Sequence, residues 1–196
     1  GALRDRQLPT QYFTGKEAGI VTDANFGEAK PLMNVTAHQV KGRLEPLLEK
    51  KVVPVVTGYI AATQDGVVTT LGRGGSDYTA TILSVALAAD EVWIWTDVDG
   101  IMTTDPKIVQ SAKMLPKLSY GEAAEMAIFG AKAMHPSALE PVIEAQIPVR
   151  IRNVFNPENP GTLIADGQET KSTEVVKAVA LIRDVAMINI KGAAMV

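Results

Sequence analysis

The sequence contains no cysteine and only two histidines among its 196 residues. The lack of cysteine excludes disulfides, thiolate metal sites and a cysteine nucleophile. No apolar run approaches the roughly 20 residues that a membrane-spanning helix needs, and the N-terminus has no signal-peptide pattern. A net charge of −3 argues against nucleic acid or an anionic membrane as a partner. These absences favour a soluble protein of the cytoplasm.

The stretch that organises the chain is residues 70–101. It reads as a strand end, a glycine-rich turn, an apolar helix that should be buried, a second strand and an acidic turn. Ser76 and Asp77 stand where the helix begins, and the positive end of a helix suits an anion. The glycines of the turn, which let a ligand approach the main chain closely, are Gly72, Gly74 and Gly75.

Arg73 adds a planar cation whose geometry matches a carboxylate or a phosphate. The second strand, residues 92–95, carries Trp93 and Trp95, which we interpret as packing on the sheet, and it is followed by the acidic turn at residues 96–100. Two loops at the same end of neighbouring strands, one suited to anions and one acidic, predict a phosphate-plus-metal site.

The rest of the pattern alternates strands with helices, which predicts right-handed crossovers and a parallel sheet. A capping box at Thr36 and Gln39 predicts a helix over residues 36–50, which Pro46 should kink or split. The β-branched run at residues 52–60 predicts an interior strand covered on both faces. Further helices are predicted at residues 119–129, behind a capping box of Ser119 and Glu122, and at residues 136–145, and further strands at residues 67–71, 148–154 and 161–165.

Four segments resemble the sequence signature of the aspartokinases, a group within the amino-acid kinase family. They follow one another with family-like spacing, and the resemblance extends over roughly residues 8–164. The segments are GRGGSDYTA at residues 72–80, WTDVDGI at 95–101, TTDPK at 103–107 and FGAKAMHP at 129–136.

The resemblance implies an α/β fold with an open, mostly parallel sheet and helices on both faces. It implies that residues 1–166 are the C-terminal part of a catalytic domain. Residues 167–174 would be a linker, and residues 175–196 the beginning of a truncated, ferredoxin-like ACT regulatory domain that binds lysine or threonine as an effector. A homo-oligomer is expected.

The reaction that the resemblance implies moves the γ-phosphoryl group of ATP to the side-chain carboxylate of L-aspartate, with Mg²⁺ neutralising the polyphosphate. It implies that Asp77 and Lys132 act in catalysis. Met102 and Lys107 stand where many relatives have tyrosine and arginine. The residues expected to bind aspartate are Arg73, Gly74, Gly75 and Ser76, and those expected to bind ATP are Thr96, Asp97, Met102, Lys107, Lys132 and Ala133; no residue is predicted to be a metal ligand.

Two alternatives remain open from the sequence. One is another amino-acid kinase, acting on glutamate, acetylglutamate or a nucleotide. The other is a non-catalytic binding or regulatory fragment, because the chain has no N-terminal strand and loop of the Lys-Phe-Gly-Gly type, which supplies a phosphate-binding lysine in the family. We therefore expect the 196-residue chain to be inactive alone.

Overall fold

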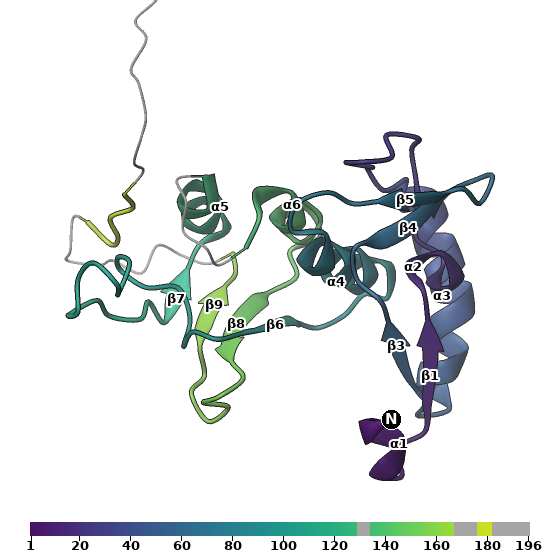
Figure 1. Ribbon diagram of the computed structural model, residues 1–196, viewed down its shortest axis with the longest axis horizontal. Helices are drawn as coiled ribbons and strands as arrows, with labels where there is room; N and C mark the ends of the chain where they lie inside the picture. The colour runs from purple at the N-terminus through teal and green to yellow at the C-terminus, as the bar shows by residue number, and fades with distance from the viewer. Residues whose placement is uncertain (129–133, 167–175, 182–196) are drawn as a thin grey trace, which may run out of the picture.

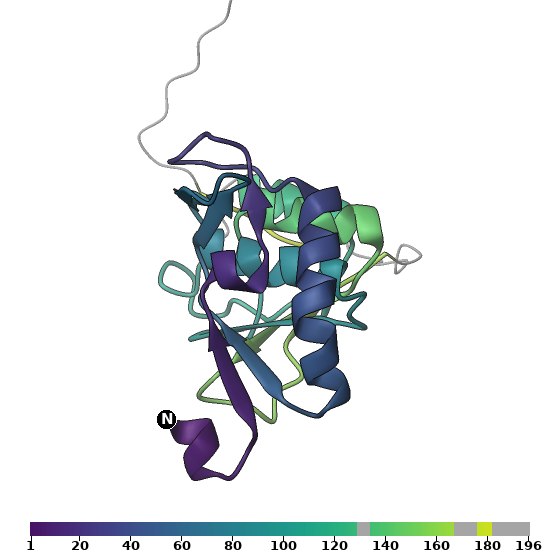
Figure 2. The same cartoon turned by 90° about the vertical axis from the view of Figure 1, so that its right-hand side faces the viewer.

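The computed structural model describes residues 1–128, 134–166 and 176–181, and Figures 1 and 2 show how the elements are arranged. The elements are α1 (Ala2–Asp5), β1 (Thr10–Phe13), α2 (Gly15–Ala18), β2 (Val21–Thr22), α3 (Met33–Glu49), β3 (Val53–Val56), β4 (Ile60–Thr63), β5 (Val68–Thr70), α4 (Gly75–Ala86), β6 (Val92–Thr96), β7 (Lys117–Leu118), α5 (Tyr120–Ile128), α6 (Pro136–Ala145), β8 (Val149–Asn153) and β9 (Thr162–Ile164). Helices and short strands are interspersed along the chain, but they do not alternate strictly, since β3, β4 and β5 follow one another and so do α5 and α6.

The described strands form three hydrogen-bonded sheets: β1-β3, β2-β4-β5 and β6-β8-β9-β7. The strands of most neighbouring pairs run parallel, and only β4 with β5 and β8 with β9 are antiparallel. The α/β class with mostly parallel strands is confirmed. Figure 1 shows α4 and α6 between the four-stranded sheet and the N-terminal strands.

Helix α4 lies at the centre of the core. It packs against α3, α6 and β6, and Ile82 in its middle is fully buried. The sequence predicts this burial from the apolar residues that surround the helix axis. The position matters for function because the helix that begins at the glycine-rich turn is held by three other elements.

The N-terminus of α3 differs from its prediction. The helix begins at Met33, and Thr36 is a buried residue of its first turn. The Thr36 hydroxyl accepts a hydrogen bond from the backbone N–H of Val21 and donates one to the Val21 carbonyl, at 3.0 and 2.9 Å. The capping box of Thr36 and Gln39 is therefore wrong, because the hydroxyl bonds to β2 instead. Pro46 lies inside α3 without splitting it.

The β-branched run at residues 52–60 is two strands rather than one. Strand β3 ends at Val56, and β4 begins at Ile60. Val53 and Val55 are each 42% exposed, so the expectation of a strand covered on both faces is also wrong. The interruption at residues 57–59 packs beside the glycine-rich turn, as described below.

The predicted helices and strands at residues 119–129, 136–145, 148–154 and 161–165 are found close to their predicted bounds, whereas β7 was not predicted. Ser119 and Glu122 form the predicted capping box at the start of α5, and α6 has the predicted bounds. Trp93 and Trp95 both lie on one face of β6, each about half exposed, with the Arg152 guanidinium stacked on both rings at 4.5 and 4.9 Å. Among the described helices, none is long and apolar enough to cross a bilayer.

Candidate functional site

The glycine-rich turn is fixed by close backbone packing. Gly72 and Gly74 have φ values of 73° and 72°, a conformation that other residues rarely adopt. A Cβ atom on Gly74 would lie 2.4 Å from the Cβ of His135, and one on Gly75 would lie 2.7 Å from the ring of Tyr59. Glycine is therefore required both for the backbone angle and for the space.

This turn leaves the start of α4 open to an anion. The N-cap is Gly74, and no side chain caps the helix. Asp77 lies in the first turn of the helix and does not cap it. The backbone N–H groups of a first helical turn have no partners inside the helix, and they carry its positive end.

The predicted acceptor residues lie around this helix start. Arg73 and Ser76 are exposed, and within the described ranges neither side chain has a hydrogen-bond or ion-pair partner. Asp77 is half-buried and likewise makes no hydrogen bond there. Burial raises the pKa of the Asp77 carboxyl, because desolvation disfavours the charged form. The turn thus presents one available cation and one poorly solvated carboxylate.

Tyr59 is a residue of this region that the sequence analysis missed. Its φ is 75°, which is uncommon for a bulky residue. Its backbone N–H donates to the Gly75 carbonyl and to the Thr79 hydroxyl, at 3.2 and 2.9 Å. A Cβ on the preceding Gly58 would lie 2.9 Å from Ser76. Gly58 within a β-branched run was the available signal, because a glycine there marks a close backbone approach.

The predicted nucleotide residues lie at the end of β6 and in the loop after it. Thr96 is the last residue of β6, and its hydroxyl donates to the exposed carboxylate of Asp97 at 3.2 Å. Met102 forms an isolated bridge with Met114, and Lys107 is exposed. Lys132 and Ala133 fall outside the described residues.

The two loops lie on the same side of the domain. Helix α4 packs against β6, which follows it after a short connection, so the start of the helix and the end of the strand lie on the same side. In the same way α6 leads into β8, which pairs with β6 in parallel register. His135, just before α6, touches Gly74. The predicted convergence of an anion-binding loop and an acidic loop is thus supported by the chain path.

A comparison with known proteins gives the family. The model of the amino acid kinase family matches residues 1–153. The chain belongs to the amino acid kinase family. The lysine-sensitive aspartokinase 3 of Escherichia coli (strain K12) is 40% identical over 188 residues, which are 96% of this chain and 41% of the relative. The aspartate kinase of Pseudomonas putida is 38% identical over 192 residues, which are 97% of this chain and 45% of the relative.

Solved structures agree with this assignment. E. coli aspartokinase III in complex with aspartate and ADP aligns with a TM-score of 0.80 and 42% identity, covering 86% of this chain and 37% of that chain. The complex of the same enzyme with lysine and aspartate aligns with a TM-score of 0.76. This amino acid kinase chain spans less than half the length of these relatives.

One exposed carboxylate at the end of β6 is of the type that Mg²⁺ uses as a ligand. Mg²⁺ usually keeps several waters and binds through one or two carboxylates together with substrate phosphates. The exposed carboxylate of Asp97 fits that requirement. Within the described parts of the chain there is no cluster of three or more acidic, histidine or cysteine side chains.

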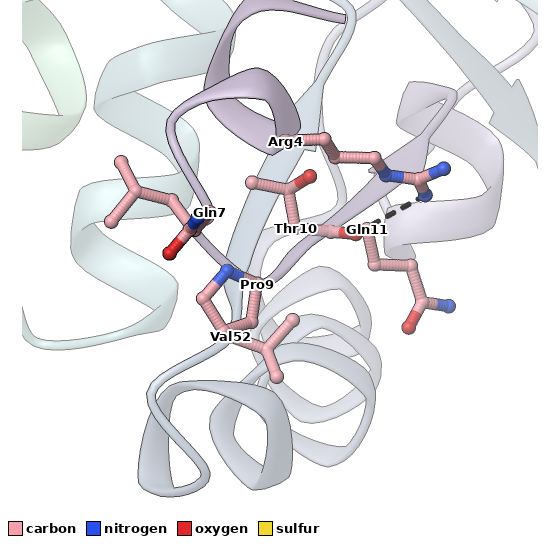
Figure 3. Close-up of a pocket in the computed structure, with 7 residues that line it drawn as sticks. Arg4, Gln7, Pro9, Thr10, Gln11 and Val52 are labelled. Atoms are coloured by element: carbon pink, nitrogen blue, oxygen red, sulfur yellow. Dashed lines mark hydrogen bonds between the residues drawn. The ribbon is translucent and has the colours of Figure 1, made fainter.

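A cavity of about 600 Å³ lies away from the two loops. It is formed where α1 meets β1, and Figure 3 shows Arg4 donating to the Thr10 carbonyl across it, at 3.4 Å. No carboxylate lines it. We assign it no part in the kinase site, because the predicted groups lie at the starts of α4 and α6 and the end of β6.

Proposed function

We propose that the protein transfers the γ-phosphoryl group of ATP to the side-chain carboxylate of L-aspartate, forming 4-phospho-L-aspartate and ADP. The observation that carries the proposal is Arg73, an exposed cation with no described partner, beside the uncapped N-terminus of α4. A dicarboxylate substrate can pair with such a guanidinium through one carboxylate and leave the other for reaction. The aspartokinase relatives, one of them solved with aspartate and ADP, support the same substrate.

In this proposal the acceptor is held by Arg73 and Ser76 at the open helix start, with Gly74 and Gly75 allowing the close approach. An oxygen of the aspartate side-chain carboxylate attacks the γ-phosphorus. The bond from that phosphorus to the oxygen bridging it to the β-phosphate breaks, and ADP leaves with the bond electrons. Asp77 orients the reacting groups from the first turn of α4.

The nucleotide is held at the end of β6 by Thr96, Asp97, Met102 and Lys107. Lys132 and Ala133, which follow α5, complete the nucleotide site in the proposal, and Lys132 offsets the charge of the transferring phosphoryl group. Bound Mg²⁺ supplies further neutralisation of the polyphosphate. Phosphoryl transfer depends mainly on such positioning and charge stabilisation.

We further propose that residues 175–196 begin an ACT regulatory domain, joined by a linker at residues 167–174, with lysine or threonine as the effector of a homo-oligomer. Contacts made by residues 176–181 support a link between this tail and the loop that follows β6. The Val179 N–H donates to the Thr103 carbonyl at 2.8 Å, and Lys177 pairs with Glu122 of α5. A movement of this tail would therefore change contacts both with the loop after β6 and with α5.

The reaction is tested by supplying ATP, Mg²⁺ and aspartate to the full-length protein and trapping the acyl phosphate with hydroxylamine. Formation of the hydroxamate with release of ADP supports the proposal. Parallel assays with glutamate, acetylglutamate and uridine monophosphate separate the other amino-acid kinases. ADP release with one of these acceptors and none with aspartate would overturn the substrate assignment.

A further inference from the structure

The acidic turn contains two carboxylates with different surroundings. Asp97 is exposed, and its described contact is the hydroxyl of the neighbouring Thr96. Asp99 is half-buried, and its Oδ1 accepts hydrogen bonds from the side-chain amides of Asn153 and Asn156, at 2.8 and 3.2 Å. The two amides come from 54 and 57 residues further along the chain. Asp99 therefore faces the protein, whereas Asp97 remains available to a ligand.

Asn153 is oriented by its own backbone surroundings. It is the last residue of β8 and stands opposite Thr96 in the parallel register. Its side-chain oxygen accepts the Phe155 N–H at 2.9 Å, so the side-chain nitrogen is the end that donates to Asp99. The next residue, Val154, donates its N–H to the Thr96 carbonyl at 2.9 Å. The turn is thus held at Thr96 by strand pairing with β8 and at Asp99 by the side-chain amide of Asn153.

The other end of the turn is held by Thr162 of β9. Its hydroxyl accepts the Ile101 N–H at 2.8 Å and donates to the Leu115 carbonyl at 2.6 Å. Gly100 has a φ of 146°, and a Cβ there would lie 2.4 Å from the same hydroxyl. One end of the turn is therefore fixed by β8 and the loop after it, and the other end by β9. Asp97 and Val98, which lie between the two ends, stay exposed.

We infer that Asn153 and Asn156 are positioning residues of the nucleotide site, which hold Asp99 so that Thr96 and Asp97 keep the orientation that binds ADP and ATP. The inference rests on the proposed function for the location of the nucleotide. Its physical basis is that hydrogen bonds to an ionised group are stronger than those between neutral groups. Two donors on one carboxylate oxygen therefore restrict the orientation of the turn.

The test measures ADP binding in the presence of Mg²⁺ through the fluorescence of Trp93 and Trp95, the two tryptophans of the chain, which lie on the same strand as Thr96. Asn153→Asp places a second carboxylate against Asp99 without changing size, and it should weaken ADP binding about ten-fold or more, as expected for loss of a hydrogen bond to a charged group. Asn156→Ala should weaken it by a smaller factor, because its bond is longer.

Two further variants separate positioning from general damage to the loop. Asn159→Ala removes a side chain of the same loop that bonds to the Gly161 N–H and not to Asp99, and it should leave ADP affinity within about two-fold of the parent. Combining Asp99→Asn with Asn153→Asp restores a donor opposite an acceptor at one of the two bonds, and it should recover part of the affinity that Asn153→Asp loses. Recovery of melting temperature without recovery of ADP affinity would overturn the inference, because it would show a role in stability alone.

Asp97→Ala provides the reference. If Asp97→Ala weakens ADP binding and Asn153→Asp does not, the positioning role is overturned and the proposed nucleotide site stands. If neither change affects ADP binding, the positioning role and the proposed nucleotide site are both overturned.

Discussion

The glycine-rich turn and the acidic turn lie on the same side of the domain, but they are held by different kinds of contact. The first is fixed by the absence of side chains: Gly74 and Gly75 let His135 and Tyr59 approach the backbone. The second is fixed by side chains, since Asn153 and Thr162 bond to it from β8 and β9.

This difference decides which groups each turn leaves for a ligand. Close packing of glycines leaves the backbone N–H groups and the Arg73 side chain at the open helix start, which suits the carboxylates of an amino acid. Side-chain hydrogen bonds occupy Asp99 and leave Asp97 exposed, which suits a metal-bound polyphosphate. The predictions below test this division, and they begin with the largest expected effect.

In the proposed reaction of the full-length protein, Asp77→Asn should lower kcat about 10³-fold, as expected for loss of a charge-stabilising group. Burial raises the pKa of Asp77, so the folded state favours the protonated carboxyl over the ionised one. The stability that the protonated form contributes is lost as pH rises through the folded pKa. The variant should therefore keep or raise the melting temperature at neutral pH. A lower melting temperature with unchanged turnover per folded molecule would make Asp77 a structural residue.

Arg73→Ala should raise the KM for aspartate about 10²-fold and leave the KM for ATP unchanged, since breaking a bound charge pair costs roughly 2–5 kcal/mol. Arg73→Lys is the matched control. It keeps the charge but loses the planar fork, so it should recover only part of the affinity. Initial-rate kinetics against each substrate measure the effect, and an equal rise in both KM values would contradict the division between the turns.

Thr162→Val should lower the free energy of unfolding by about 2–3 kcal/mol, because it leaves the buried Ile101 N–H and the Leu115 carbonyl without their partner. Thr162→Ser keeps the hydroxyl and should lose less. Urea unfolding measures both variants. A loss with Thr162→Ser and none with Thr162→Val would show that the methyl group, and not the hydrogen bonds, holds the acidic turn.

Gly74→Ala should destabilise the protein by about 1–3 kcal/mol, because the new Cβ overlaps His135 and the backbone has a positive φ. Gly42→Ala is the control. It lies inside α3 with open space around it, and it should stabilise by up to about 1 kcal/mol. If Gly74→Ala leaves the urea midpoint unchanged, close packing does not fix the glycine-rich turn.

Lys177→Met should have the smallest effect, below about 1 kcal/mol at neutral pH, because the pair with Glu122 is partly exposed. Burial raises the pKa of Glu122, but the hydrogen bonds from Lys177 and Ser119 together lower it by more than burial raises it. The net shift of the Glu122 pKa is therefore downward. The pair thus stabilises the fold above the ordinary pKa of a glutamate and loses this effect as pH falls through the lower folded value. The difference between parent and variant melting temperatures should therefore vanish in acid.

The sequence alone determined the elements whose causes are local. The apolar periodicity of α4 and α6, the Ser119–Glu122 capping box and the glycine-rich turn all follow from neighbouring residues. The same local reasoning failed at Thr36, where a hydroxyl that suits a helix cap bonds to Val21 instead.

The tertiary structure alone decided which groups meet across long separations in the chain. Local spacing places Asp97 and Asp99 together in one acidic turn. The bonds from Asn153 and Asn156, in β8 and its following loop, show that Asp99 faces the protein while Asp97 stays exposed. The place of Tyr59 beside Gly75 was set in the same way, by packing of the interrupted strand against α4. The physical reason is that a hydrogen bond or a close contact depends on distance in space, which residue patterns within one segment do not contain.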